Sequence, residues 1–230
     1  MIMDLYIILS EKQWHNELFV NLQRKYESHV KWIWIDNKND FTICKLNELN
    51  PSKIFIPHWS YIIDKAIYEK YECIVFHMTD LPYGRGGSPL QNLIVKGHKE
   101  TKISAIKIDE GIDTGAVYLK EPLSLDGTAK EIFKRATPII QKMIERIIDE
   151  RIEPKPQEGD AVVFKRRKKS EGNIFELQEI EKIYDYIRML DCEGYPNAFI
   201  ETENFKIDFS NAKFNNEQAI IKANVRIYKK

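Results

Sequence analysis

Short apolar runs alternate with amphipathic stretches through the first half of the chain. The runs predict buried strands at 4–9, 30–35, 53–56 and 73–77, and the stretches predict helices at 12–27 and 63–70. Alternation of strand and helix is typical of a mostly parallel sheet covered by helices. We therefore predict an α/β fold with a doubly wound sheet, whose ligands bind at the carboxyl ends of the strands.

Glycine is concentrated after the fourth predicted strand. Seven of the ten glycines fall between Pro82 and Gly127, where they allow the backbone to approach a ligand closely. Ser88 followed by Pro89 predicts an N-cap and the first residue of a helix that runs to about Val95. Further along, the pattern predicts two paired strands at 103–108 and 116–123 and a long helix at 128–151.

The predicted domain organisation is one large domain with a small appendage. Residues 1–151 form the large α/β domain, 152–160 a polar linker with prolines, and 161–230 a small C-terminal α+β module. Within the module we expect a strand near 161–164, a helix near 177–190 and short alternating stretches from 198 to 228.

Composition excludes several classes of protein. With 43% hydrophobic residues and only 10 glycines and 9 prolines in 230, the chain is neither collagenous nor disordered. Its 35 basic and 35 acidic residues cancel, so no global field attracts nucleic acid or anionic lipid.

The cysteines and the N-terminal run bear on the compartment. Cys44, Cys73 and Cys192 lack paired spacing, which argues against disulfides and structural zinc. The run Ile2–Leu9, interrupted by Asp4, predicts a strand rather than a signal peptide, and we expect a cytoplasmic protein.

Two residues stand out as candidates for chemistry. His77 ends a predicted buried strand immediately before a Gly-rich turn, where an open α/β sheet presents catalytic side chains. Asp113 lies in a tight loop between two predicted strands, and a carboxylate near a histidine orients it and stabilises its charged form. Position alone leaves two alternatives open, namely a hydrogen-bonded core histidine and an ordinary acidic hairpin.

The segments 73–86 (CIVFHMTDLPYGRG) and 111–115 (GIDTG), taken together, resemble the folate-dependent formyltransferases. The resemblance extends from about residue 53 to 148 and implies a Rossmann-like sheet, 10-formyltetrahydrofolate as formyl donor and no metal. It assigns catalytic roles to His77 and Asp113, which are 36 residues apart. His77 would accept a proton from the attacking amine, and Asp113 would stabilise the protonated intermediate.

The same resemblance suggests which residues hold the two substrates. For the folate it suggests two loops, with Trp59, Ser60, Tyr61 and Ile62 in one and Asp109, Glu110, Gly111 and Ile112 in the other. For the amine acceptor it suggests Met78, Thr79, Tyr83, Arg85, Gly86 and Gly87. The remaining histidines, His15, His29, His58 and His98, are too scattered for a metal site, although His58 lies near the proposed pocket.

Val75 departs from the family pattern. The family usually has an asparagine two residues before the histidine, where its amide helps to hold the formyl oxygen as negative charge develops. Loss of one such donor typically costs about a hundred- to a thousandfold in rate. The sequence offers four substitutes: Asn92, Gln91, the Thr79 hydroxyl and a backbone N–H of the Gly-rich turn.

The acceptor is predicted from weaker signals. The run Lys165–Lys169 is the one strong basic cluster, and it could bind phosphates or form a solvated edge. The junction after it resembles that of sugar N-formyltransferases, and the segment 76–89 resembles the formyltransferases of pseudaminic acid biosynthesis. We therefore expect a UDP-linked 4-amino deoxy sugar as acceptor, a homodimer, and neither a nucleic acid nor a membrane as partner.

Two alternatives compete with the sugar enzyme. One is a methionyl-tRNA formyltransferase-like enzyme, against which the short tail and neutral net charge argue. The other is a noncatalytic folate or nucleotide-sugar binder that lost the asparagine.

Overall fold

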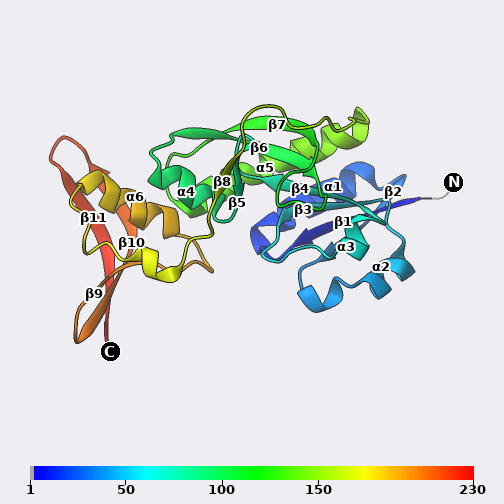
Figure 1. The fold of residues 1–230 in the computed structure, drawn as a ribbon. Coiled ribbons are helices and arrows are strands. Elements are labelled where there is room, and N and C mark those ends of the chain that lie inside the picture. Colours follow the sequence, from blue (N-terminus) through cyan, green and yellow to red (C-terminus); the bar gives the residue numbers. More distant parts are fainter. Residues whose placement is uncertain (1–2) are drawn as a thin grey trace. The chain divides into compact units, whose positions relative to one another are not determined.

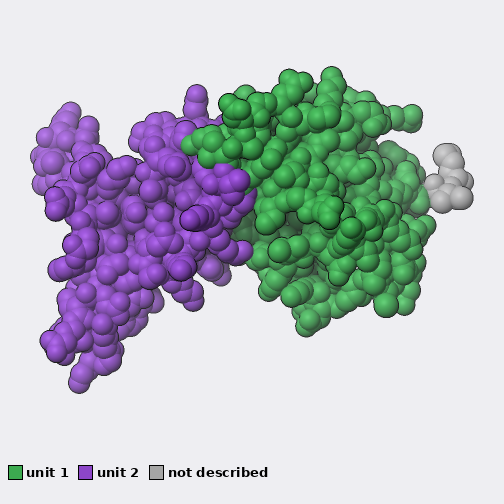
Figure 2. All heavy atoms as spheres, in the orientation of Figure 1, with its two compact units in different colours: residues 1–85, 102–123, 134–162 green, residues 86–101, 124–133, 163–230 purple. Residues whose placement is uncertain are grey.

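The computed structural model describes residues 3–230, which form two compact units. Unit 1 consists of the residues up to Arg85, Lys102–Leu123 and Lys134–Val162, and unit 2 of Gly86–Thr101, Ser124–Phe133 and Val163–Lys230 (Figure 2). The units interleave along the chain, because the segments Gly86–Thr101 and Ser124–Phe133 belong to unit 2 although unit 1 continues after each of them. The predicted domain boundaries at residues 151 and 161 therefore remain predictions.

Unit 1 is built on a six-stranded sheet (Figure 1). Its strands, in spatial order, are β2 (Val30–Ile35), β1 (Asp4–Ser10), β3 (Lys53–His58), β4 (Glu72–His77), β6 (Glu100–Lys107) and β7 (Val117–Ser124). The pairs β1/β2, β1/β3 and β3/β4 are parallel, whereas β4 and β6 are antiparallel. The mostly parallel α/β sheet is thus confirmed.

Most predicted helices are present with shifted ends. The structure has α1 (Asn16–Tyr26), α2 (Ile43–Leu49), α3 (Lys65–Tyr68), α4 (Pro89–Val95), α5 (Ala129–Asp149) and α6 (Ile180–Leu190), with 3-10 turns at Gln13–His15, Lys38–Asp40 and Lys169–Gly172. The sequence pattern missed α2, whose first turn is capped by Thr42 Oγ1 accepting from the Lys45 N–H at 3.3 Å.

Ser88 occupies the predicted N-cap position of α4 but does not cap the helix with its side chain. Ser88 has a left-handed backbone, with φ of +51°, and its side chain makes no capping bond. Its Oγ instead accepts the backbone N–H of Arg167 at 3.1 Å, so the serine ties two segments of unit 2 together. Pro89 does occupy the start of the helix.

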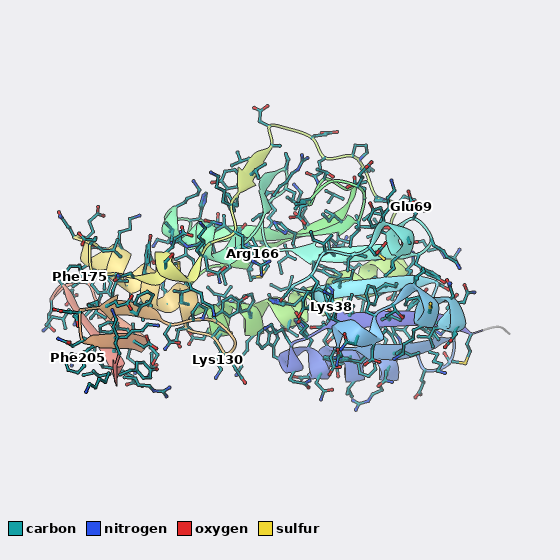
Figure 3. All side chains as sticks on the ribbon, turned by 60° about the horizontal axis from the view of Figure 1, so that its bottom comes forward. Lys38, Glu69, Lys130, Arg166, Phe175 and Phe205 are labelled. Carbon is teal, nitrogen blue, oxygen red and sulfur yellow. The ribbon has the colours of Figure 1, made fainter. Side chains whose placement is uncertain are left out.

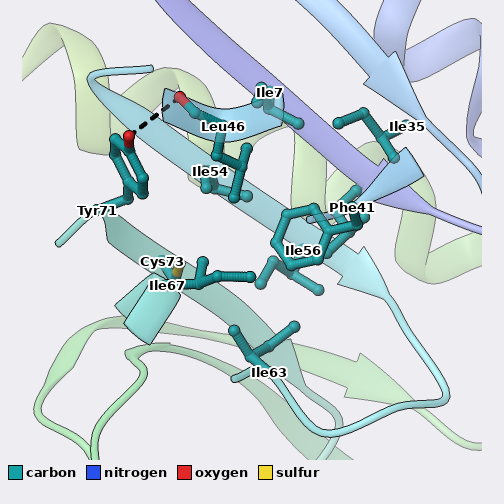
Figure 4. Packing of buried hydrophobic residues seen from close by; sticks show 11 residues of the cluster. Ile7, Ile35, Phe41, Leu46, Ile54, Ile56, Ile63, Ile67, Tyr71 and Cys73 are labelled. Atoms are coloured by element: carbon teal, nitrogen blue, oxygen red, sulfur yellow. Dashed lines mark hydrogen bonds between the residues drawn. The ribbon is translucent and has the colours of Figure 1, made fainter. Parts of the chain in front are cut away.

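Apolar residues of the parallel strands and of α2 and α3 form the core of unit 1 (Figure 4). Ile7, Ile54 and Leu46 are fully buried there, and each contributes about 1.5–3 kcal/mol relative to an exposed side chain. Tyr71 is also buried, and its hydroxyl donates to the Leu46 carbonyl at 3.0 Å. This core fixes β3 and β4, whose ends carry the candidate site.

Unit 2 contains an antiparallel sheet of β9 (Ala198–Glu201), β10 (Phe205–Asn215) and β11 (Ile220–Lys229), in the order β11-β10-β9. The short stretches expected between 198 and 228 therefore include two long strands. Buried Arg188 of α6 pairs with Asp185 at 2.7 Å and donates to the carbonyls of Leu125 and Gly127, which satisfies its charge.

The Gly-rich turn also contains a strand that the sequence pattern missed. β5 (Tyr83–Gly86) pairs with β8 (Val162–Phe164) in a two-stranded sheet. Within residues 3–230, none of the helices has the length and apolarity needed to cross a membrane.

Candidate active site

Strand β4 places His77 in a buried position at the carboxyl end of the parallel strands. The residue is only 7% exposed, and its Nε2 lies 2.8 Å from the carbonyl oxygen of Gly84. A carbonyl only accepts hydrogen bonds, so Nε2 carries a hydrogen and donates it. The turn after the strand thus fixes the tautomer of the imidazole and leaves Nδ1 for other chemistry.

The loop between β6 and β7 brings Asp113 to that second nitrogen. The loop leaves the sheet beside Cys73, whose carbonyl accepts the Ile108 N–H at 2.9 Å, because β6 runs antiparallel to β4. It nonetheless places Asp113 Oδ2 3.5 Å from His77 Nδ1. Both ring nitrogens therefore face oxygen acceptors, an arrangement suited to hold a protonated imidazole.

The conformation of this loop is tightly constrained. Asp113 has a positive φ of +53°, in the left-handed region that aspartate tolerates better than most residues. Asp109 Oδ1 accepts from the Thr114 hydroxyl at 2.5 Å and from the Gly111 N–H at 3.2 Å. A Cβ at Gly115 would lie 1.7 Å from the Lys107 carbonyl oxygen, so only glycine fits.

Gln157 supports the loop from a segment that the sequence predicted to be a linker. Its Nε2 donates to the carbonyls of Asp113 and Gly115, both at 2.8 Å. Its Oε1 accepts from Arg85 Nε at 3.1 Å and Nη2 at 2.8 Å. Sequence reasoning missed this residue because a polar side chain among prolines and acidic residues gives no local signal of a buried contact.

The two predicted folate loops expose apolar side chains. Ile62 is 89% and Ile112 67% exposed, and the Trp59 ring lies 5.5 Å from that of Tyr61. An ion pair between Lys65 and Glu110, at 3.9 Å, links the loop of Asp109–Ile112 to the helix that follows the other loop. Ser60 donates its N–H to Glu11 at 3.0 Å. Exposed aliphatic and aromatic side chains can pack on the flat face of a ring system, and roles in folate binding remain predictions for both loops.

The predicted acceptor residues fall into three groups. Met78 and Thr79 are buried, and the Thr79 hydroxyl donates to the Gly84 carbonyl at 3.3 Å, while Tyr83 is half-buried in β5. The Arg85 guanidinium binds Gln157, as described above. Positions 86 and 87 require glycine because the backbone of another segment of this chain passes close to them. A Cβ on Gly86 would lie 2.4 Å from the Phe164 carbonyl oxygen, and one on Gly87 would lie 2.6 Å from Arg166 Cβ. Roles in acceptor binding remain predictions for all six residues.

Two further histidines lie beyond β1 and at the end of β3: His15 ends the 3-10 turn that follows β1, and His58 is the last residue of β3. Burial lowers the pKa of His15 to about 3, helped by His58 and Lys12, and burial lowers the pKa of His58 to about 4. His15 Nδ1 is 2.7 Å from Ser10 Oγ. In the described part of the chain, no group of three or more His, Cys, Asp or Glu residues is arranged to hold a metal ion.

Comparison with known proteins identifies the family. Residues 169–228 match the model of the methionyl-tRNA formyltransferase C-terminal domain. A solved methionyl-tRNA formyltransferase from Clostridium thermocellum is 48% identical, with a TM-score of 0.94 and complete coverage of both chains. The chain belongs to the folate-dependent formyltransferases. A curated methionyl-tRNA formyltransferase from Thermodesulfovibrio yellowstonii is 31% identical over 178 residues, and the match covers 74% of this chain but only 58% of that relative.

More remote solved structures share the fold alone. Aquifex aeolicus HypX, solved with tetrahydrofolic acid, is 16% identical with a TM-score of 0.74, over 92% of this chain and 38% of that one. Solved sugar N-formyltransferases reach only 14–16% identity and TM-scores of 0.68–0.70. Members of the family use 10-formyltetrahydrofolate as the formyl donor.

These comparisons contradict two predictions about the acceptor of this formyltransferase chain. The nucleotide-linked amino sugar was inferred from short motifs, but identity over the whole chain favours the methionyl-tRNA enzymes. The exclusion of nucleic acid was wrong for a related reason. Net charge reports the average field, whereas a local basic run can bind phosphates in a neutral protein. The expected homodimer and cytoplasmic location remain predictions.

Val75 lies in β4 at the position where the family usually has an asparagine. Its side chain is partly buried and packs against the core. Three of the four proposed substitutes for the family asparagine donate elsewhere. Asn92 Nδ2 donates to the carbonyls of Gly87 and Lys165, Gln91 Nε2 to that of Met189, and the Thr79 hydroxyl to that of Gly84. Which of the four groups replaces the asparagine stays a prediction.

Proposed function

We propose that this chain transfers the formyl group of 10-formyltetrahydrofolate to the α-amino group of methionyl-tRNA. The observation that carries the choice of acceptor is the 48% identity to a methionyl-tRNA formyltransferase over the full length of both chains. The transfer chemistry is supported by His77, whose ring nitrogens face Gly84 and Asp113.

The imidazole acts as the proton acceptor. With its hydrogen on Nε2 donated to Gly84, neutral His77 has a lone pair on Nδ1. When the amine nitrogen bonds to the formyl carbon, it becomes positively charged and loses a proton to Nδ1. The resulting imidazolium directs one N–H to the Gly84 carbonyl and the other to the Asp113 carboxylate. The bond between the formyl carbon and the folate nitrogen would then break. The proton held on the imidazolium is available for that nitrogen as tetrahydrofolate leaves.

The folate supplies a formyl carbon activated for attack by an amine. The loops Trp59–Ile62 and Asp109–Ile112 would hold it, because their exposed Tyr61, Ile62 and Ile112 side chains can pack on the flat face of its ring system. Asp113 lies one residue beyond the second loop. Binding of the donor and placement of the carboxylate would therefore depend on the same stretch of backbone.

A basic surface on unit 2 supports a polyanionic acceptor. Lys165, Arg166, Lys168 and Lys169 are exposed, and Arg166 is labelled in Figure 3. Arg167 is mostly buried and donates to the Glu171 carbonyl at 3.1 Å, which anchors the run. Exposed lysine and arginine side chains are the groups that contact phosphates in nucleic-acid complexes.

The test is formyl transfer by the purified full chain. Methionyl-tRNA is incubated with 10-formyltetrahydrofolate, and formylmethionine is measured by mass spectrometry after deacylation. Free methionine and uncharged tRNA serve as acceptor controls, and His77→Asn as the enzyme control. We expect formylmethionine only from methionyl-tRNA. The rate of formylation by His77→Asn should be at least about 100-fold lower than that of the wild type. Formylation of another amine in place of methionyl-tRNA would contradict the proposed acceptor.

A further inference from the structure

We propose that Gln157 is a positioning residue for His77 and Asp113. Its side-chain amide joins the two segments of unit 1 that contact the two ring nitrogens of His77. The inference rests on the proposed formyl transfer and adds to it a residue from the 152–160 stretch.

The amide of Gln157 is saturated with hydrogen bonds. A primary amide has two N–H donors and two acceptor lone pairs. Both donors are directed to the backbone carbonyls of Asp113 and Gly115, and the oxygen receives two N–H groups of Arg85. The guanidinium only donates and the carbonyls only accept, so the amide cannot be flipped. A carboxylate or an ammonium at this position would satisfy only one side.

The partners of Gln157 lie directly beside the partners of His77. Gly84, whose carbonyl accepts from His77 Nε2 at 2.8 Å, precedes Arg85 in the chain. Asp113, whose carboxylate faces His77 Nδ1 at 3.5 Å, gives its backbone carbonyl to Gln157. One side chain therefore sets the spacing between the two groups that flank the imidazole.

The loop needs such an external support. Asp113 adopts a left-handed backbone, which is unfavourable for a non-glycine residue and persists only where its surroundings impose it. Asp109 secures the first part of the loop through Thr114 and Gly111, whereas Gln157 holds the carbonyls on either side of Thr114. Without Gln157 the Asp113 carboxylate would lose its fixed distance to His77.

A displaced carboxylate predicts a specific kinetic change. Misplacement of a reacting or supporting group by about 1 Å can cost about 100-fold in rate while the substrates still bind. We expect Gln157→Ala to lower kcat about 10- to 100-fold and to change KM for methionyl-tRNA less than about threefold.

Gln157→Glu separates positioning from general stability. Glutamate keeps the contact to Arg85 as an ion pair, but it brings carboxylate oxygen against the carbonyls of Asp113 and Gly115. We expect kcat to fall at least as far as in Gln157→Ala, with a melting temperature no lower than that of Gln157→Ala. Gln141→Ala is the matched control, since Gln141 of α5 also uses both its amide oxygen and its amide nitrogen, in one hydrogen bond each, to Asn21 and Glu145. It should retain wild-type kcat.

The decisive measurement is a double-mutant cycle with Asp113→Asn. If Gln157 acts through Asp113, Gln157→Ala lowers kcat in the wild-type background but has less than a twofold further effect in Asp113→Asn. An equal loss in both backgrounds, or a kcat within twofold of wild type in both Gln157 variants, would overturn the inference.

Hydrogen exchange of the amides in 109–116 tests the same placement without turnover. Exchange should be at least about 10-fold faster in both Gln157 variants and unchanged in Gln141→Ala. If the wild-type chain fails to formylate methionyl-tRNA, the proposed function fails, and this exchange measurement alone decides the positioning role. Unchanged exchange in the Gln157 variants would overturn it.

Discussion

The carboxylate of Asp113 lies 3.5 Å from Nδ1 of His77, although β6 leaves the sheet beside Cys73 rather than beside His77. The contact depends on a loop that returns along β4 and on a left-handed backbone at Asp113 itself. The relationship between the two residues is therefore a property of the tertiary structure and gives the first prediction.

Asp113→Asn should lower activity with little loss of stability. Asparagine tolerates the left-handed backbone, so the free energy of unfolding should change by less than about 1 kcal/mol. The neutral amide no longer stabilises a protonated imidazole, and kcat should fall about 10- to 1000-fold. Steady-state kinetics and urea unfolding measure the two effects. A variant with wild-type kcat would remove Asp113 from the mechanism.

Gly115→Ala should destabilise the chain more than Gly97→Ala. The new Cβ would lie 1.7 Å from the Lys107 carbonyl oxygen, and neither backbone can yield without moving the loop. Overpacking of this kind costs about 1–3 kcal/mol or more. Gly97 has φ of +83° with open space around it, so its alanine variant costs only about 1–2 kcal/mol of backbone strain.

Urea unfolding compares the two glycine variants, and kcat provides a second readout. We expect Gly115→Ala also to lower kcat, because the loop that must move carries Asp113. Gly97→Ala should leave kcat unchanged. Equal kinetics in both variants would show that the loop adapts without disturbing the site.

Both the elements that the sequence predicted and those it missed have physical reasons. The starts of β1 to β4 were predicted to within one residue because continuous apolar runs such as Ile54–Ile56 have few alternatives to burial, whereas β6 begins three residues before the predicted 103. The sequence pattern did not predict helix α2, because the helix is only seven residues long and buries only Leu46, which is too little to show a helical period. Ser88 is the N-cap residue but makes no capping bond, and its Oγ instead accepts the N–H of Arg167, a distant partner that no local pattern predicts.

The candidate site divides in the same way. His77 and Asp113 were found from motif order, yet their contact, the antiparallel direction of β6 and the support from Gln157 depend on partners 36 to 80 residues away. The acceptor was mistaken because short motifs outweighed the similarity of the whole chain, which a single sequence cannot reveal.

The buried histidine His15 predicts a loss of stability in mild acid. Burial lowers its pKa from the ordinary 6.5 to about 3, so the unfolded chain binds the proton at a higher pH than the folded protein does. Stability is therefore full above pH 6.5 and falls as the pH decreases toward 3, by up to about 1.4 kcal/mol per pH unit.

His15→Gln should remove this contribution to the pH dependence. Between pH 6.5 and 5 the free energy of unfolding of the wild type should fall about 2 kcal/mol more than that of the variant. Urea unfolding at pH 8, 7, 6.5 and 5 measures the difference, which should be constant from pH 8 to 7. Parallel pH profiles would show that His15 becomes protonated in the folded state.

The exposed basic run should control binding of the acceptor and leave the chemical step intact. Lys165 and Lys168 are exposed in unit 2, and loss of a phosphate contact weakens nucleic-acid binding without touching the reacting atoms. The double variant Lys165→Gln/Lys168→Gln should therefore raise KM for methionyl-tRNA about 3- to 10-fold with kcat unchanged. Lys31→Gln/Lys142→Gln, at exposed positions of unit 1, is the charge-matched control.

The salt dependence of binding gives a second readout. Because each neutralised phosphate contributes about 0.9 to the slope of log affinity against log salt, Lys165→Gln/Lys168→Gln should flatten that slope and the control should not. A KM that responds equally to both pairs would assign the effect to net charge instead of to this run.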